Sequence, residues 1–172
     1  KISGKTAEWV MDPVFLCNKS EYISLSDKSR CRDKDYIFAY IVNPDSRNCE
    51  TKFTGLEKVS DKLGLGLRIT ITAEKVLESM ASKNRFMYPY ENNCSVEDWL
   101  YFIINCGFVV TTSFHALCFC MLVEKPFFFV QGDMNDKHGF DRIRTLLTTA
   151  DLMDRVYPTV EDALHSDVLQ RD

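Results

Sequence analysis

Several short apolar stretches, rich in β-branched and aromatic residues, predict buried strands. They cover residues 36–42, 67–72, 109–112 and 127–129, with a shorter candidate at 86–89 that ends in a proline. Asn43 and Pro44 end the first stretch, because this pair favours a turn.

Apolar residues at helical spacing predict helices between these strands. Ser95 caps one helix, with Asp98 as its third residue, and Ser113 caps another. Gly64 ends an earlier helix, since glycine readily adopts the left-handed conformation of a helix end. Further helices are expected over residues 52–63, 72–81, 140–149 and 159–170, and residues 132–139 are interpreted as a polar loop.

This alternation of strands and helices predicts a Rossmann-like α/β fold, in which helices cover both faces of a mainly parallel sheet. We expect about five strands, with the central strand ending near Thr112. Residues 35–172 are assigned to this domain. Residues 1–34 are polar and irregular, and we interpret them as a connector from a missing amino-terminal half, with residues 12–16 docked on the domain.

Composition narrows the class of protein. A net charge of −4 over 172 residues argues against bulk attraction to nucleic acid or to an anionic membrane. No apolar run approaches the ~18 residues of a membrane span, and there is no signal peptide. The seven cysteines form no C-x-x-C pair, and the three histidines have no zinc-site spacing. These features predict a cytoplasmic protein without a bound metal.

His115 is the main candidate for chemistry. It follows the strand 109–112 and falls in the first turn of the helix that Ser113 caps. Open α/β sheets bind ligands at the carboxyl ends of their parallel strands, so this position favours an acid–base or anion-binding role. The alternative is a buried histidine bonded to a neighbouring strand.

The segment around His115 resembles the polysaccharide pyruvyl transferase family, whose pattern is roughly V-V-T-D-S-F-H-G-T-x-F-S followed by K-P-F. The matching residues are Val109–Ala116, Phe119-Cys120 and Lys125-Pro126-Phe127. Further matches lie before and after this segment, in the order of the family: Asp12–Leu16, Val96–Leu100, Arg142–Leu147 and Leu152–Arg155. Two positions depart from the pattern, because Thr112 replaces an aspartate and Ala116 replaces a glycine.

The resemblance implies the carboxyl-terminal half of a GT-B-like enzyme with two facing Rossmann-like halves. It also implies transfer of the enolpyruvyl group of phosphoenolpyruvate to two hydroxyls of a sugar, which releases phosphate and leaves a pyruvate ketal in a surface or exopolysaccharide. The partners would be phosphoenolpyruvate, a glycan or lipid-linked sugar and the missing half, so this fragment alone is expected to be inert. No cofactor is implied, because phosphoenolpyruvate is a substrate.

Four further residues are candidates for substrate binding. Arg142, at the position of the family arginine, can bind a phosphate or carboxylate, or it can pair with Asp141 or Glu124. Lys137 and His138 lie in the predicted loop, where they either close over an anion or are merely solvated. Ser113 caps its helix and has a hydroxyl that can reach a phosphate.

Two other functions are compatible with the same residues. The first is a GT-B glycosyltransferase that uses a nucleotide sugar, which would need an acidic residue for the ribose hydroxyls. The second is a non-catalytic, glycan-binding remnant. The loss of the aspartate at Thr112 keeps a degenerate or acceptor-shifted enzyme open, because threonine cannot carry a charge.

Overall fold

The computed structural model describes residues 10–42, 54–71, 94–131 and 137–170. Five parallel strands form one sheet in the order β2-β1-β3-β4-β5. The strands are β1 (Tyr36–Ile41), β2 (Gly66–Ile71), β3 (Phe108–Thr111), β4 (Phe127–Val130) and β5 (Val156–Tyr157). The strand order reverses between β1 and β3, so the switch point of the sheet lies at their carboxyl ends.

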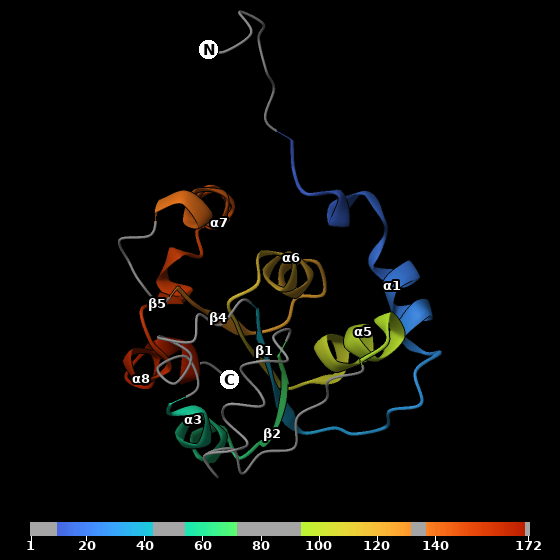
Figure 1. The fold of residues 1–172 in the computed structure, drawn as a ribbon, viewed down its shortest axis with the longest axis horizontal. Helices are drawn as coiled ribbons and strands as arrows, with labels where there is room; N and C mark the ends of the chain where they lie inside the picture. The colour runs from blue at the N-terminus through green and yellow to red at the C-terminus, as the bar shows by residue number, and fades with distance from the viewer. Residues whose placement is uncertain (1–9, 43–53, 72–93, 132–136, 171–172) are drawn as a thin grey trace, which may run out of the picture.

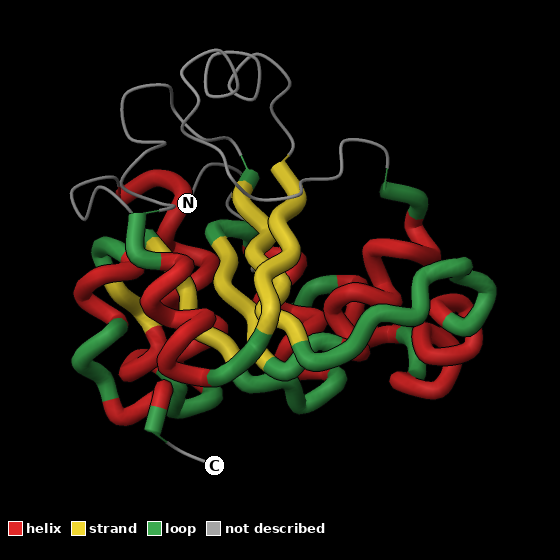
Figure 2. Tube along the Cα trace, turned by 90° about the horizontal axis from the view of Figure 1, so that it is seen from below, coloured by secondary structure: helices red, strands yellow, loops and turns green. Residues whose placement is uncertain are grey.

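Helices cover both faces of the sheet (Figure 1). One face carries α5 (Val96–Asn105), α6 (Phe114–Leu122) and α7 (Lys137–Thr149), and the other carries α3 (Leu56–Leu63) and α8 (Val160–Ala163). Seen from a second direction, the strands lie between helices on both sides (Figure 2). The helix α1 (Lys19–Ser26) packs outside α5, and the short 3-10 helix η1 (Pro13–Leu16) packs on α6.

The alternation of side chains along the strands produces two cores. In β1, Ile37 and Ala39 point toward α3 and α8, whereas Tyr36 and Phe38 point toward α5 and α6. All four side chains are at most 4% exposed. A strand that is buried on both faces in this way is typical of a parallel sheet.

The structure confirms the helix ends expected from the sequence. Ser95 accepts a hydrogen bond from the backbone N–H of Asp98, and Ser113 accepts one from Ala116. Gly64 has φ 64° and ends α3 in the left-handed conformation. The central strand, β3, ends at Thr111, one residue before the expected end.

Four expectations about local structure are wrong. The first 34 residues are not irregular throughout, since Asn18 and Glu21 form a capping box at the start of α1. Lys137 and His138 do not lie in a loop but in the first residues of α7, because one glycine costs a helix only about 1 kcal/mol and the apolar side chains of α7 pack in the core.

The other two errors lie near the carboxyl end of the chain. The single helix expected at 159–170 is divided into α8 and a 3-10 helix η3 (Asp167–Leu169), because the backbone and hydroxyl groups of Ser166 both bond the carbonyl of Ala163. The two-residue strand β5 was not predicted, and it is too short to show an apolar pattern. It follows a 3-10 turn, η2 (Met153–Arg155).

The expected helix at 72–81 and the expected strand at 86–89 lie outside the described residues. Within the described ranges, no helix combines the length and the apolar character that a bilayer span requires.

Candidate active site

Threonine side chains tie the carboxyl ends of β1 and β3 together. Thr111 Oγ1 donates to the carbonyl of Tyr40 over 2.7 Å. Thr112 Oγ1 accepts from the backbone N–H of Val42 over 2.9 Å and donates to the carbonyl of the same residue over 3.2 Å. A carboxylate at position 112 could accept the hydrogen bond from the N–H of Val42, but it could not donate one to the carbonyl of Val42. The hydroxyl of Thr112 therefore fixes the switch point of the sheet.

Ser113 and His115 begin α6 directly above this switch point. Ser113 is 5% exposed, and its Oγ accepts from the N–H of Ala116 over 3.3 Å, so the structure places it as a helix cap. The His115 side chain is 62% exposed, which excludes the alternative of a buried core histidine. Its backbone is thus fixed by the cap while its imidazole stays open to solvent.

The Asp12 carboxylate lies beside the imidazole. Asp12 Oδ2 is 3.6 Å from His115 Nε2, a distance typical of an ion pair and slightly longer than a hydrogen bond. The Asp12 side chain is only 12% exposed. An open histidine with one carboxylate on one ring nitrogen is suited to hold and release a proton.

The geometry of Asp12 is set by the segment that carries it. Asp12 Oδ1 accepts from the N–H of Val14 over 2.9 Å and caps η1. Pro13 follows as the first residue of this short helix. The Tyr22 hydroxyl of α1 donates to the carbonyl of Val14 over 3.1 Å, and the Tyr22 ring packs edge-on against Phe119 of α6. The docking expected for residues 12–16 is confirmed.

Arg142 approaches the same end of α6 from α7. Its Cζ lies 4.4 Å from the centre of the Phe114 ring, and that ring is 5.7 Å from the His115 ring, centre to centre. The guanidinium carbon and the imidazole centre are therefore at most about 10 Å apart. A phosphate-bearing donor can bridge this span with hydrogen bonds of about 3 Å at each end.

The two structural alternatives for Arg142 are not observed. Asp141 Oδ1 lies 3.8 Å from Arg144 Nη1, and Glu124 Oε2 lies 3.7 Å from Lys19 Nζ. The backbone of Lys137 and His138 belongs to the first turn of the helix that carries Arg142, but their side chains lie outside what the structure describes. Their predicted binding roles stay predictions.

Cysteine chemistry does not contribute to this site. Burial raises the pKa of Cys106 and Cys118 to about 12 and raises that of Cys120 well above its ordinary value, so these thiols stay protonated near neutral pH. At Cys118 the Asp12 carboxylate adds to this rise and the Arg142 guanidinium opposes it. These two charges therefore flank one part of α6. No cluster of metal-binding side chains occurs in the described segments.

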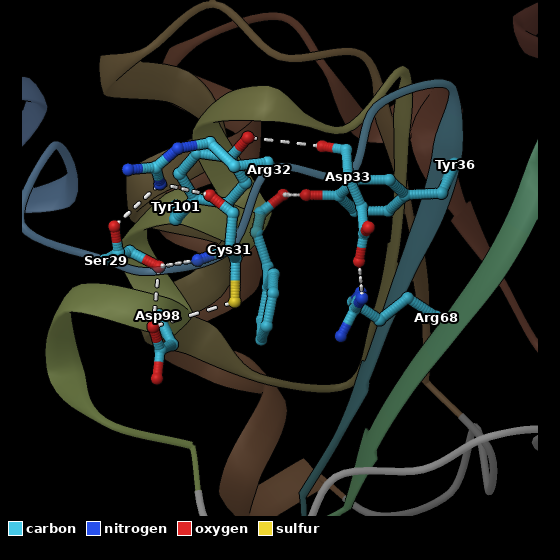
Figure 3. Close-up of polar contacts among 9 residues, drawn as sticks. Ser29, Cys31, Arg32, Asp33, Tyr36, Arg68, Asp98 and Tyr101 are labelled. Atoms are coloured by element: carbon cyan, nitrogen blue, oxygen red, sulfur yellow. Dashed lines mark hydrogen bonds and ion pairs between the residues drawn. The ribbon is translucent and has the colours of Figure 1, made fainter.

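A second polar cluster lies along α5, in the segment that joins α1 to β1 (Figure 3). Ser29 Oγ donates to Asp98 Oδ1 over 2.6 Å and accepts from the N–H of Cys31 over 3.0 Å. The hydrogen bond from Ser29 lowers the pKa of Asp98. Asp33 pairs with Arg68, and its carbonyl accepts from the Tyr101 hydroxyl over 3.3 Å. These polar groups bind one another.

Two cavities in the described part of the chain lie at the opposite, amino edge of the sheet. One, of about 330 Å³, is lined by Asp33, Tyr36 and Arg68 among others. The other, of about 710 Å³, is lined by Lys125 and Arg155 among others. Neither includes His115 or Arg142, so the candidate active site rests on the exposed groups at the carboxyl edge.

Asp12 is the site residue that the sequence reasoning missed. The segment Asp12–Leu16 was expected to dock, but no chemical role was assigned to its aspartate. The available signal was the Asp-Pro pair, which predicts a helix cap and not a contact with a histidine more than 100 residues away. That contact depends on the packing of η1 against α6.

Comparison with solved structures supports the fold. The wall teichoic acid polymerase TagF, in a structure obtained after a soak with CDPG, superimposes with a TM-score of 0.50 at 15% sequence identity. The similarity covers 89% of this chain and 39% of TagF. At this identity it shows the fold alone, and it agrees with the expected Rossmann-like sheet of a GT-B-like enzyme.

Sequence comparison identifies the family. No curated protein matches the chain. The model of the polysaccharide pyruvyl transferase family matches residues 1–133 of the 172, a range that contains η1, the switch point, His115 and the Lys125-Pro126-Phe127 segment. Since this match covers well over half of the chain, the chain belongs to the polysaccharide pyruvyl transferase family.

Proposed function

We propose that this chain belongs to an enzyme that transfers the enolpyruvyl group of phosphoenolpyruvate to two hydroxyls of a sugar and forms a pyruvate ketal. Membership in a family of transferases supports the reaction class. The observation that carries the proposal is the exposed imidazole of His115, held at the switch point of the sheet with the Asp12 carboxylate 3.6 Å from Nε2.

The first step of the proposed reaction is the protonation of the enol carbon of phosphoenolpyruvate. The imidazolium of His115 donates a proton to C3 of phosphoenolpyruvate, and a sugar hydroxyl oxygen adds to C2 and loses its own proton. The proton of the first hydroxyl returns to the imidazole of His115. The C2–O bond to phosphate then breaks, the second hydroxyl adds to C2, and its proton goes to the departing phosphate. Phosphoenolpyruvate and a diol thus become a ketal and phosphate, with no oxidation or reduction.

The donor carries a phosphate and a carboxylate, and the chain offers cations for both. The Arg142 guanidinium stacks on Phe114 with its edge available for a bidentate contact to either group. Lys137 and His138, at the start of the same helix, would add positive charge. The Ser113 hydroxyl, already used as a cap, would contribute at most a secondary contact.

The remaining parts of the proposal follow from the family. No metal or nucleotide takes part, the acceptor is a glycan or a lipid-linked sugar, and a further domain supplies the facing wall of the cleft. The chain spans 39% of the length of TagF, which leaves room in a protein of that size for such a domain. A nucleotide-sugar transferase is less well supported. Such an enzyme needs an acidic residue for the ribose hydroxyls, but Glu124 follows α6 at the far end from His115 and pairs with Lys19.

Titration calorimetry on the full-length protein tests the proposal. Phosphoenolpyruvate should bind, and a nucleotide sugar should not. Binding of the nucleotide sugar alone would instead indicate a glycosyltransferase, and binding of neither ligand would indicate a glycan-binding protein. Release of inorganic phosphate from phosphoenolpyruvate, dependent on a diol-bearing glycan and lost in His115→Ala, would then establish the reaction.

A further inference from the structure

We propose that Asp12 is a positioning residue for His115, and that η1 and α1 act as the brace that holds it there. This inference rests on the proposed function. It assigns a role to the amino-terminal segment, for which the pyruvyl-transfer reaction itself makes no demand.

The two oxygens of the Asp12 carboxylate have different partners. Its Oδ1 is engaged by the N–H of Val14, so Oδ2 is the oxygen that faces the imidazole. The side chain is 12% exposed, so little water competes for that oxygen. A carboxylate held in this way exerts a stronger and better-directed field than a freely rotating surface aspartate.

The brace behind Asp12 is packed on both sides. Val14 and Phe15 of η1 pack against the core that contains α6, and the Tyr22 hydroxyl bonds the carbonyl of Val14. The Tyr22 ring lies 4.8 Å from Phe119 of α6, centre to centre and edge-on. Since α6 also carries His115, the aspartate and the histidine are held by one packed unit.

The charges around His115 leave this role to Asp12. The imidazole faces the Asp12 carboxylate at the N-cap of η1, and Arg142 of α7 contacts the Phe114 ring that packs edge-on against the imidazole. Thr112 is uncharged, and its hydroxyl is bonded to Val42 in both directions. Among the described residues, Asp12 is therefore the carboxylate that can act on this ring.

The contact between Asp12 and His115 determines which ring nitrogen donates the proton. Because Nε2 faces Asp12, the proton for C3 leaves the imidazolium from Nδ1. The neutral ring keeps its proton on Nε2, beside the carboxylate. Asp12 thus fixes the orientation and the tautomer of the ring, without touching the donor itself.

A double-mutant cycle on turnover tests the role. Asp12→Asn removes the charge but keeps an oxygen for the N–H of Val14, and should lower kcat on the order of 10- to 100-fold with little change in KM for phosphoenolpyruvate. In a His115→Ala background the same substitution should have no further effect, because Asp12 acts only through the ring. Losses that multiply in the double variant would overturn the proposal.

Asp162→Asn is the matched control for this cycle. Asp162 also caps a short helix, since its Oδ2 accepts from the N–H and the hydroxyl of Thr159. It lies on α8, across the sheet from α6. Its substitution should leave kcat unchanged, and a loss equal to that of Asp12→Asn would show that capping alone explains both.

A chemical measurement tests the contact without the reaction. Diethyl pyrocarbonate modifies unprotonated imidazole nitrogens, and mass spectrometry resolves His115 from the exposed His165 as an internal reference. At pH 8 the rate at His115 relative to His165 should rise about twofold in Asp12→Asn, because the released ring offers both of its nitrogens in turn and no longer Nδ1 alone. An unchanged ratio would overturn the positioning role. If the wild-type protein forms no ketal, the proposed function fails, yet this ratio still decides the Asp12 contact.

Discussion

Two polar regions on the same face of the sheet are built in opposite ways. Along α5, Ser29 and Asp98 bond each other, and Asp33 pairs with Arg68 while its carbonyl receives the Tyr101 hydroxyl (Figure 3). At the start of α6, His115 is largely exposed and touches Asp12 only at ion-pair distance.

The difference separates structural polar groups from available ones. A side chain whose donors and acceptors bind neighbouring protein groups lowers the free energy of the folded state and has little left for a ligand. Under the proposed function, His115 and Arg142 serve a ligand, and their substitution should change activity more than stability. Substitutions at His115, Arg142, Ser29 and Thr112, with matched controls, test this distinction.

The largest effect is expected for His115→Ala. Loss of an acid–base group should lower turnover of the full-length enzyme by about 10²-fold or more. The melting temperature should hardly change, since the side chain is 62% exposed. Steady-state kinetics and thermal melts measure the two quantities, and a variant that melts much earlier but keeps wild-type turnover would reverse the assignment.

The next effect is on donor binding. Arg142→Ala should raise KM for phosphoenolpyruvate about 10-fold, and Arg142→Lys should recover only part of this, because lysine lacks the planar bidentate fork. Arg144→Ala is the matched control, as Arg144 lies two residues along the same helix and pairs with Asp141. Equal increases in KM for the two alanine variants would argue against a specific anion site.

In the polar cluster along α5, a substitution is expected to change stability alone. Ser29→Ala should lower the free energy of unfolding by about 1 kcal/mol at pH 7 without changing KM. Because the hydrogen bond from Ser29 lowers the pKa of Asp98 in the folded state, its contribution is present above the ordinary aspartate pKa and is lost as the pH falls through the lowered value. The penalty should therefore shrink as the pH falls below the ordinary range of an aspartate pKa.

Ser26→Ala provides the control for that pH dependence. Ser26 is equally buried, but its hydroxyl donates to the carbonyl of Ile23, which does not titrate. Urea unfolding at several pH values should show a constant penalty for this variant. A penalty for Ser29→Ala that is just as constant would contradict the charge-assisted bond to Asp98.

The smallest effect is expected at the switch point. Thr112→Val removes the two hydrogen bonds to Val42 and should lower the free energy of unfolding by about 0.5 kcal/mol. Thr112→Ser keeps the hydroxyl, so its free energy of unfolding should stay close to that of the wild type. Comparative thermal melts measure the difference. Identical melting temperatures for the two variants would show that the hydroxyl does not fix the ends of β1 and β3.

The local pattern was sufficient to predict most of the elements that carry the site. The apolar strand before Thr112, the cap at Ser113 and the histidine in the first helical turn each follow from interactions within a few residues, and the structure has all three. Elements with little pattern were missed or misplaced. The strand β5 has only two residues, and α7 begins at Lys137, within the stretch 132–139 that was interpreted as a polar loop.

The sequence by itself determined the parallel α/β fold, the family and the position of His115 at the end of a buried strand, because periodicity, caps and motifs are local properties of the chain. Only the tertiary structure decided that Asp12 faces His115, that Arg142 stacks on Phe114, and that Thr112 bonds Val42. Each of these contacts joins residues that lie 28 or more positions apart, so it depends on how η1, α7 and β1 pack around α6 and β3. No periodic pattern encodes that packing, since it results from the burial of side chains from all of these elements at once.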